Sequence, residues 1–204
     1  MKLIVCAFLL SLAAAIQVVP VPSPSDGFIQ GPSRSNYTLE VFIDFLDTRS
    51  ATAFPAVLSY WSSQKGWLEL IIHQFPMSYN LFSFPVSQAG RYIQQNYRTK
   101  YMDFVNYWFA HQQSFISSIG TLDFQTANAK IAQLTNAATG VPITGITNAL
   151  SNQTVNWSTR VSWKYGATRN LPGVPSYLVN GVWVPDAYNF TSVSDWTNFF
   201  NSLN

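Results

Sequence analysis

The chain has 204 residues, of which 48% are hydrophobic and 16% aromatic but only 10% are charged. This length predicts one domain, or at most two, and the composition supplies enough apolar side chains for a sizeable core. The formal net charge is +2 and Lys and Arg form no cluster. Binding to nucleic acid or to an anionic membrane surface depends on grouped cations, so neither is expected here.

The first fifteen residues predict a secretory signal peptide. Met1-Lys2 gives a positive start, Leu3 to Leu12 is an apolar run, and Ala13-Ala14-Ala15 is a small-residue cleavage site. The run is too short to span a bilayer as a helix. We expect a mature chain that starts near Ile16 and is secreted or lumenal, because Phe199 to Asn204 resembles neither a retention signal nor an anchor tail.

Cysteine and histidine are scarce. The one cysteine, Cys6, lies inside the predicted signal peptide, so cleavage would leave a mature chain that has no thiol chemistry and no thiolate metal site. The two histidines, His73 and His111, lack the spacing of metal ligands. We therefore expect neither a metal nor another cofactor.

Asn-x-Ser/Thr sequons occur at four positions and agree with a secretory route. Each is a candidate N-glycosylation site on an exposed loop or helix end. The four positions are Asn36, Asn152, Asn156 and Asn189.

Residues 16–36 are rich in Pro, Ser and Gly and predict a loose N-terminal arm. Within this arm, Asp26 to Gln30 is a candidate edge strand. From Thr38 to Leu46 the chain is nearly continuous in apolar residues, which is typical of a strand buried on both faces. We expect the folded domain to cover residues 37–204.

A helix is predicted from Thr48 to Ser63, with Asp47 as its N-cap. Pro55 lies inside this segment and should kink it. Trp67 to Phe75 then predicts a second buried strand. Asp47-Thr48-Arg49-Ser50 thus lies between a buried strand and a helix, where functional side chains are often placed.

The segment from Val86 to about Gly166 is helical in pattern. Its breaks fall near residues 120–121, 140–142 and 151–152, where Gly, Pro, Ser and Asn occur. This segment predicts a helical insertion at about residues 86–168.

The C-terminal part predicts a hairpin and a helix. Ser176 to Val179 and Val182 to Val184 flank Asn180-Gly181, a strong signal for a type I′ turn. Thr191-Ser192 opens a last amphipathic helix. The expected buried side chains of that helix are Trp196, Phe199 and Phe200.

The predicted order is strand, strand, helix, strand, helical block, hairpin and helix. Three further features accompany this order. They are the segment DGFIQGPSRSNYTLEVFIDF, Pro55 five residues beyond Ser50, and Gly173-Val174-Pro175-Ser176 before the hairpin. In this order and spacing the mature chain resembles the thioredoxin fold, specifically its DsbA-like branch. The resemblance implies an α/β domain with a helical insertion and a cis-proline loop at Val174-Pro175.

The departure from this family lies at its active-site motif. The family's Cys-x-x-Cys falls on Asp47-Thr48-Arg49-Ser50. Disulfide exchange needs an attacking thiolate and a resolving thiol, and Asp and Ser supply neither. The residues therefore predict a redox-inactive relative, and an oxidoreductase assignment would rest on homology alone. Asp47 supplies negative charge at a helix N-terminus, where it either caps the helix only or also meets a ligand.

The retained scaffold predicts binding of an extended polypeptide at the face formed by Asp47 and Pro175. In active relatives the residue before this proline, here Val174, offers backbone hydrogen bonds to a peptide, and this β-augmentation needs no sulfur. Arg49 could present a charge to an acidic partner. The loop from Phe75 to Pro85 is the candidate rim of an apolar groove. Its rim residues are Phe75, Phe82 and Phe84.

One enzymatic alternative remains open, and a second is disfavoured by the placement of its residues. Glutathione transferases of the kappa class use a serine hydroxyl near the helix start to hold the cofactor thiolate. Asp47 would repel a thiolate, so Thr48 or Ser50 would have to take over. A hydrolase triad of Ser50, His73 and either Asp44 or Asp47 has the right residue types, but Ser50 lacks a nucleophile elbow and His73 is expected to be a buried structural histidine.

Overall fold

The computed structural model describes residues 22, 25–32, 35–64, 66–120 and 122–203. The predicted signal peptide, residues 1–15, lies outside the described residues. In the described part, the strands form one mixed sheet in the order β1-β3-β2-β4-β5. β2 and β3 are parallel and the other neighbouring strands are antiparallel. The strands are β1 (Phe28–Gln30), β2 (Tyr37–Ile43), β3 (Leu68–Gln74), β4 (Ser176–Val179) and β5 (Val182–Trp183).

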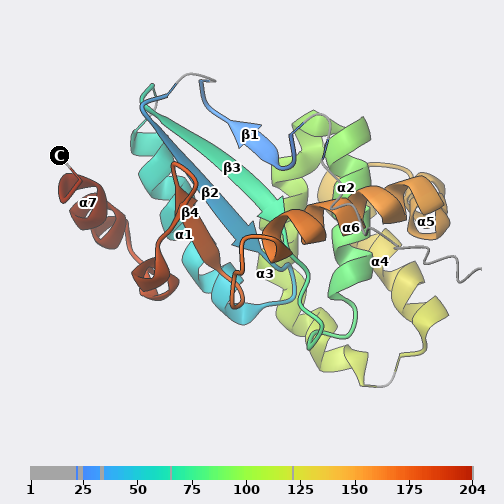
Figure 1. Cartoon of the computed structure of the whole chain (residues 1–204). Coiled ribbons are helices and arrows are strands. Elements are labelled where there is room, and N and C mark those ends of the chain that lie inside the picture. The colour runs from blue at the N-terminus through green and yellow to red at the C-terminus, as the bar shows by residue number, and fades with distance from the viewer. Residues whose placement is uncertain (1–21, 23–24, 33–34, 65, 121, 204) are drawn as a thin grey trace, which may run out of the picture.

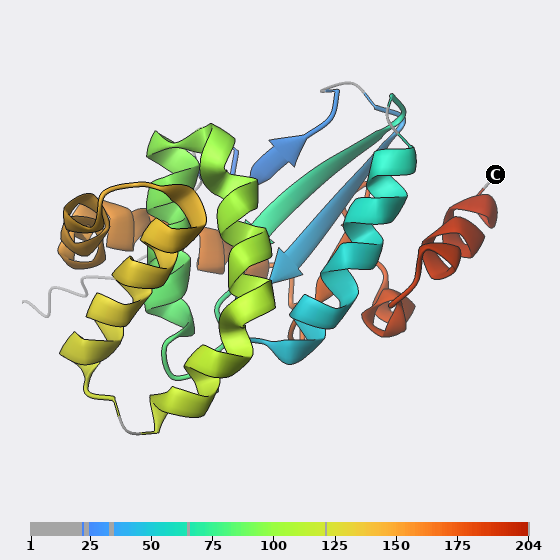
Figure 2. The same ribbon diagram turned by 180° about the vertical axis from the view of Figure 1, so that it is seen from behind.

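Helices lie on both faces of this sheet (Figures 1 and 2). Figure 1 shows α6 in front of α2, with one end at the tip of β3, and Figure 2, seen from behind, shows α1 on the opposite face of the sheet. Helices α2 to α6 all lie between β3 and β4 in the chain, so the predicted helical insertion is present. The helices are α1 (Thr48–Ser63), α2 (Ser83–Asn96), α3 (Tyr101–Ile119), α4 (Phe124–Thr139), α5 (Ile143–Ser151), α6 (Gln153–Ala167) and α7 (Val193–Asn201), with short 3₁₀ turns η1 (Arg98–Lys100) and η2 (Pro185–Asn189).

Side chains of β2 contribute alternately to two apolar layers, one on each face of the sheet. Leu39, Val41 and Ile43 belong to the main core on the α1 side, whereas Phe42 belongs to a smaller cluster on the α6 side. Successive side chains of a strand point to opposite faces, so a strand covered on both faces reads as a continuous apolar run. β2 ends at Ile43 rather than at the predicted Leu46.

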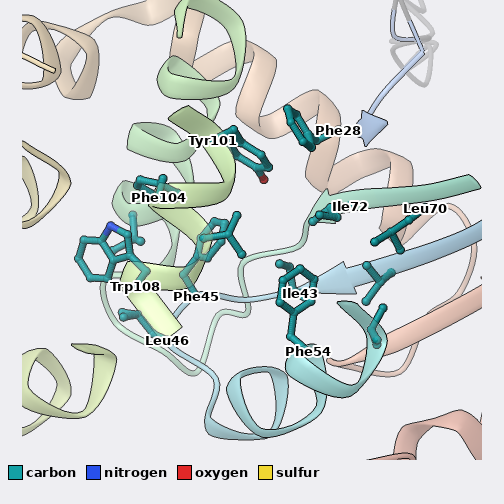
Figure 3. Packing of buried hydrophobic residues seen from close by; sticks show 14 of the residues in the cluster. Phe28, Ile43, Phe45, Leu46, Phe54, Leu70, Ile72, Tyr101, Phe104 and Trp108 are labelled. Carbon is teal, nitrogen blue, oxygen red and sulfur yellow. The ribbon is translucent and has the colours of Figure 1, made fainter. Parts of the chain in front are cut away.

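The main core joins the sheet to the insertion (Figure 3). Phe45, just beyond β2, packs edge-on against Phe104 of α3 with ring centroids 5.0 Å apart. Trp108, one turn further along α3, is fully buried beside it. Because one contiguous core spans both parts, the insertion is held rigidly against the end of β2 where the predicted motif begins.

Local sequence signals account for several boundaries. The predicted type I′ turn is confirmed, since Asn180 and Gly181 both have positive φ, 49° and 77°. α1 begins and ends where predicted and continues through Pro55. One break was not predicted: α2 ends at Asn96 and the chain restarts through η1.

The predicted N-terminal arm is partly docked on the domain. Its candidate edge strand is confirmed as β1, which pairs antiparallel with β3. Asp26, just before β1, is only 6% exposed. Among the described residues, no helix combines the length and the apolar character that crossing a membrane requires.

Candidate functional site

The degenerate motif lies at the N-terminus of α1. Asp47 adopts extended backbone angles, and its Oδ2 accepts a hydrogen bond from the Ser50 backbone N–H at 2.6 Å. Asp47 is half-buried, Thr48 and Arg49 are exposed and Ser50 is fully buried. The carboxylate therefore satisfies one of the free N–H groups at the helix start, and only part of the motif faces solvent.

The loop before β4 contains a cis peptide bond between Val174 and Pro175, as the resemblance implies. Ser176 closes the loop by donating its hydroxyl to the Gly173 carbonyl at 2.7 Å. Val174 is 3% exposed and packs in the smaller cluster with Phe75. Within the described part of the chain, no hydrogen bond reaches the main-chain N–H or C=O of Val174.

A groove of about 380 Å³ runs beside this loop. Trp183, Tyr188 and Tyr79 leave 43%, 42% and 64% of their surfaces exposed. The lining is mostly apolar and aromatic, and it consists of Tyr79, Pro172, Gly173, Val174, Pro175, Ser176, Trp183, Val184, Pro185 and Tyr188. We call it the cis-proline groove.

The degenerate motif reaches this groove through Arg49. Its guanidinium carbon lies 4.3 Å from the centre of the Tyr188 ring, a cation–π contact. Asp47 acts on the groove electrostatically: burial raises the pKa of Tyr79, and the nearby carboxylates of Asp47 and Asp44 raise it further. The structure thus brings the motif and the proline loop together around the rings of Tyr79 and Tyr188.

Asp44 is a site residue that sequence reasoning considered only as a triad candidate. It is fully buried, and it accepts hydrogen bonds from the backbone N–H of Leu46 at 2.8 Å and of Met77 at 2.9 Å. The side chains of Asn80 and Ser83 also donate to it. Burial raises the pKa of Asp44 although these four donors oppose the shift. Asp44 directly follows β2 and anchors the loop that follows β3.

His73 is confirmed as a buried structural residue. Its Nδ1 lies 2.9 Å from Asp26 Oδ2 and its Nε2 lies 3.0 Å from Glu40 Oε2. Both ring nitrogens therefore face carboxylates remote from Ser50, whose Oγ accepts from the Asp44 backbone N–H at 3.5 Å. The structure does not assemble a hydrolase triad.

The predicted aromatic rim is divided by the fold. Phe75 and Phe84 line a second cavity on the other side of the loop after β3. Phe82 does not: it is 2% exposed and lies in the main core between Phe115 and Phe124. The assignment of Phe82 to a rim is therefore wrong, because neighbouring residues at the start of a helix point in different directions.

The sequons occupy different environments. Asn36 and Asn189 are exposed, and Asn152 is exposed at the N-cap of α6, where its side chain accepts from the Thr154 and Val155 backbone N–H groups. Asn156 departs from the expected exposed position, because it is half-buried within α6 and its Nδ2 donates to Gln88 Oε1 at 3.1 Å. A glycan on that nitrogen would remove this hydrogen bond.

Neither hydroxyl of the motif is well placed to hold a glutathione thiolate. Ser50 is fully buried beneath the helix start, so its hydroxyl is out of reach of a bound thiolate. Thr48 is exposed, but the Asp47 carboxylate lies beside it and would repel a negative sulfur.

No protein-family model matches the chain, and no curated protein matches it either. Solved structures do. BdbD from Bacillus subtilis in its oxidised form has a TM-score of 0.69 at 13% identity, over 86% of this chain and 91% of that one. The alpha-DsbA1 protein of Wolbachia pipientis has a TM-score of 0.65 at 11% identity, over 92% and 94%. A protein-disulfide isomerase from Novosphingobium aromaticivorans has a TM-score of 0.67 at 14% identity, over 86% and 96%.

These likenesses show that the chain adopts the thioredoxin fold with the helical insertion of DsbA-like proteins. At the positions where the resemblance places the two cysteines, this chain has Asp47 and Ser50. The fold and the cis-proline loop are therefore present without sulfur in the motif.

Proposed function

We propose that this protein is a secreted, redox-inactive thioredoxin-fold protein that binds an extended polypeptide segment in the cis-proline groove. The observation that carries the proposal is the unpaired main chain of Val174 beside an open aromatic groove, within the part of the chain that the structure describes. Secretion rests on the predicted signal peptide, and redox inactivity on the absence of any cysteine after Cys6.

The main chain of Val174 is suited to pairing with another chain. In the described part its N–H and C=O make no hydrogen bond, although its side chain is buried. A polar main-chain group gains most when its partner excludes water. An extended peptide that lies along residues 173–175 would satisfy both groups, which is recognition by strand addition.

Side-chain selection would come from the groove wall. Trp183 and Tyr188 present large, partly exposed rings, the residue types that dominate binding energy at protein interfaces. Arg49, held over Tyr188, adds one positive charge at the edge. A segment with apolar side chains that contact the rings, and an acidic residue next to Arg49, would fit this surface.

The test is binding of fluorescent, cysteine-free unfolded peptides to the mature protein and to Trp183→Ser. Trp183 is partly exposed, so its replacement leaves the core intact, whereas Val174→Arg would place a charge in a buried position. Val182→Ser is the matched control, since Val182 is 68% exposed in the same strand and outside the groove. We expect about tenfold weaker binding for Trp183→Ser only. Equal binding by all three proteins would move the function away from this groove.

A further inference from the structure

A second cavity, of about 640 Å³, shares no residue with the cis-proline groove. It lies between the loop after β3 and the C-terminal half of α6. Its apolar lining consists of Phe75, Pro76, Met77, Leu81, Phe84, Trp163, Ala167 and Leu171, and its polar lining of Ser78, Asn80, Arg160, Lys164 and Asn170. Its volume is within the range of small-molecule sites. We call it the α6 cavity.

Large apolar side chains around the α6 cavity remain in contact with water. Leu81 is 66% exposed and Trp163 is 37% exposed. The Trp163 ring stacks on Phe75, with centroids 6.0 Å apart and planes 27° from parallel. Exposed apolar groups gathered around a hollow indicate a binding surface more strongly than scattered ones do.

The charges on the α6 cavity are all positive. Arg160 and Lys164 line it from successive turns of α6, and none of its described lining residues is Asp or Glu. Among the described residues, neither cation takes part in an ion pair. Arg160 donates a hydrogen bond from its Nε to Asn156 Oδ1 at 2.8 Å. Its terminal nitrogens remain able to donate to a ligand. Like charges at this spacing repel each other, and an anion between them would reverse that repulsion.

We propose that the α6 cavity binds a long-chain carboxylate, with the alkyl chain over Trp163 and Leu81 and the head group between Arg160 and Lys164. An apolar hollow with cations on one side matches a molecule that has one apolar and one anionic end. The carboxylate would accept charge-assisted hydrogen bonds from both cations, and the alkyl chain would remove the exposed rings from water. The proposal does not depend on peptide binding.

The test is calorimetric titration with dodecanoate and dodecyltrimethylammonium, each below its micelle concentration, and with dodecanol below its solubility limit. We expect saturable binding of dodecanoate in preference to the neutral and cationic probes. The double variant Arg160→Gln/Lys164→Gln should bind dodecanoate about tenfold more weakly. Lys100→Gln/Lys130→Gln, which lowers the net charge equally but lies outside the cavity, should bind it normally.

A second pair of variants tests the apolar part. Leu81→Asp places a negative charge on an exposed position of the cavity, and Val182→Asp does the same at a similarly exposed position outside it. Only Leu81→Asp should abolish dodecanoate binding. The proposal is overturned if the three probes bind equally, if no saturable binding occurs, or if Arg160→Gln/Lys164→Gln binds dodecanoate as tightly as the unaltered protein.

Discussion

Replacing Asp26 by asparagine should destabilise the protein more than any exposed charge change. Asp26 lies in the segment before β1 and is 6% exposed. Its carboxylate meets Arg91 Nη2 at 2.7 Å, the Ser162 hydroxyl at 2.8 Å and His73 Nδ1 at 2.9 Å. These three groups come from α2, α6 and β3, so this one side chain ties together elements that are distant in the chain.

The magnitude follows from the charges that remain. In the Asp26→Asn variant the amide would keep one acceptor oxygen. Among the described residues, the Arg91 guanidinium would then have no ion-pair partner, and the His73 ring would have only Glu40. Removing one partner of a buried ion pair costs about 3–5 kcal/mol. Domains are stable by only about 5–15 kcal/mol, so the variant should lose a large part of its folding free energy.

The assay is urea unfolding of the mature protein, with circular dichroism as the readout. It is done at about pH 6, below the ordinary pKa of histidine, so that His73 is charged. Asp103→Asn is the matched control, because Asp103 also pairs with a cation, Lys100 at 3.5 Å, but the side chains of the pair are 54% and 50% exposed. The control should lose less than about 1 kcal/mol. If the two variants lost equal free energy, the buried pair would not be stabilising the docked segment and the reasoning would be refuted.

Three further outcomes are expected. Asp47→Ala should lower the free energy of unfolding by about 1 kcal/mol, because it removes the N-cap of α1; thermal unfolding measures this. In the same assay, Phe82→Ala should cost about 3–5 kcal/mol and Phe84→Ala clearly less, since only Phe82 is fully packed. In a pH series, stability should fall below about pH 4, because folding lowers the pKa values of Asp26 and Glu40 and their protonation favours the unfolded chain. Stability should also fall above about pH 6.5, because folding raises the pKa of His73 and loss of its proton favours the unfolded chain.

Much of the chain follows rules that act over a few residues, and these parts could be predicted. Asp47 before an amphipathic segment predicts an N-cap, and the structure has that cap. Asn180-Gly181 between two apolar runs predicts a type I′ turn, because both residues tolerate positive φ. The apolar run that forms β2 predicts a strand buried on both faces. The order of such elements was enough to indicate the thioredoxin fold.

Boundaries that depend on tertiary contacts were predicted less well. β2 stops at Ile43 because Asp44 turns its carboxylate toward the backbone N–H of Leu46 and of Met77 in the loop after β3. The interruption after Asn96 has no Gly or Pro to mark it. The Met77 partner of Asp44 lies 33 residues further along the chain, so the sequence around Asp44 does not indicate this contact.

The amino-acid sequence by itself determined the elements, their order and the absence of sulfur from the motif. Only the tertiary structure decided which side chains share a site. Phe82 and Phe84 are near neighbours, yet one enters the core and the other a cavity. Asp26, Glu40 and His73 come from different elements and meet around one ring. The periodicity of apolar residues indicates which side of each element is buried. The contacts between these side chains depend instead on how α6 and the segment before β1 pack against the sheet.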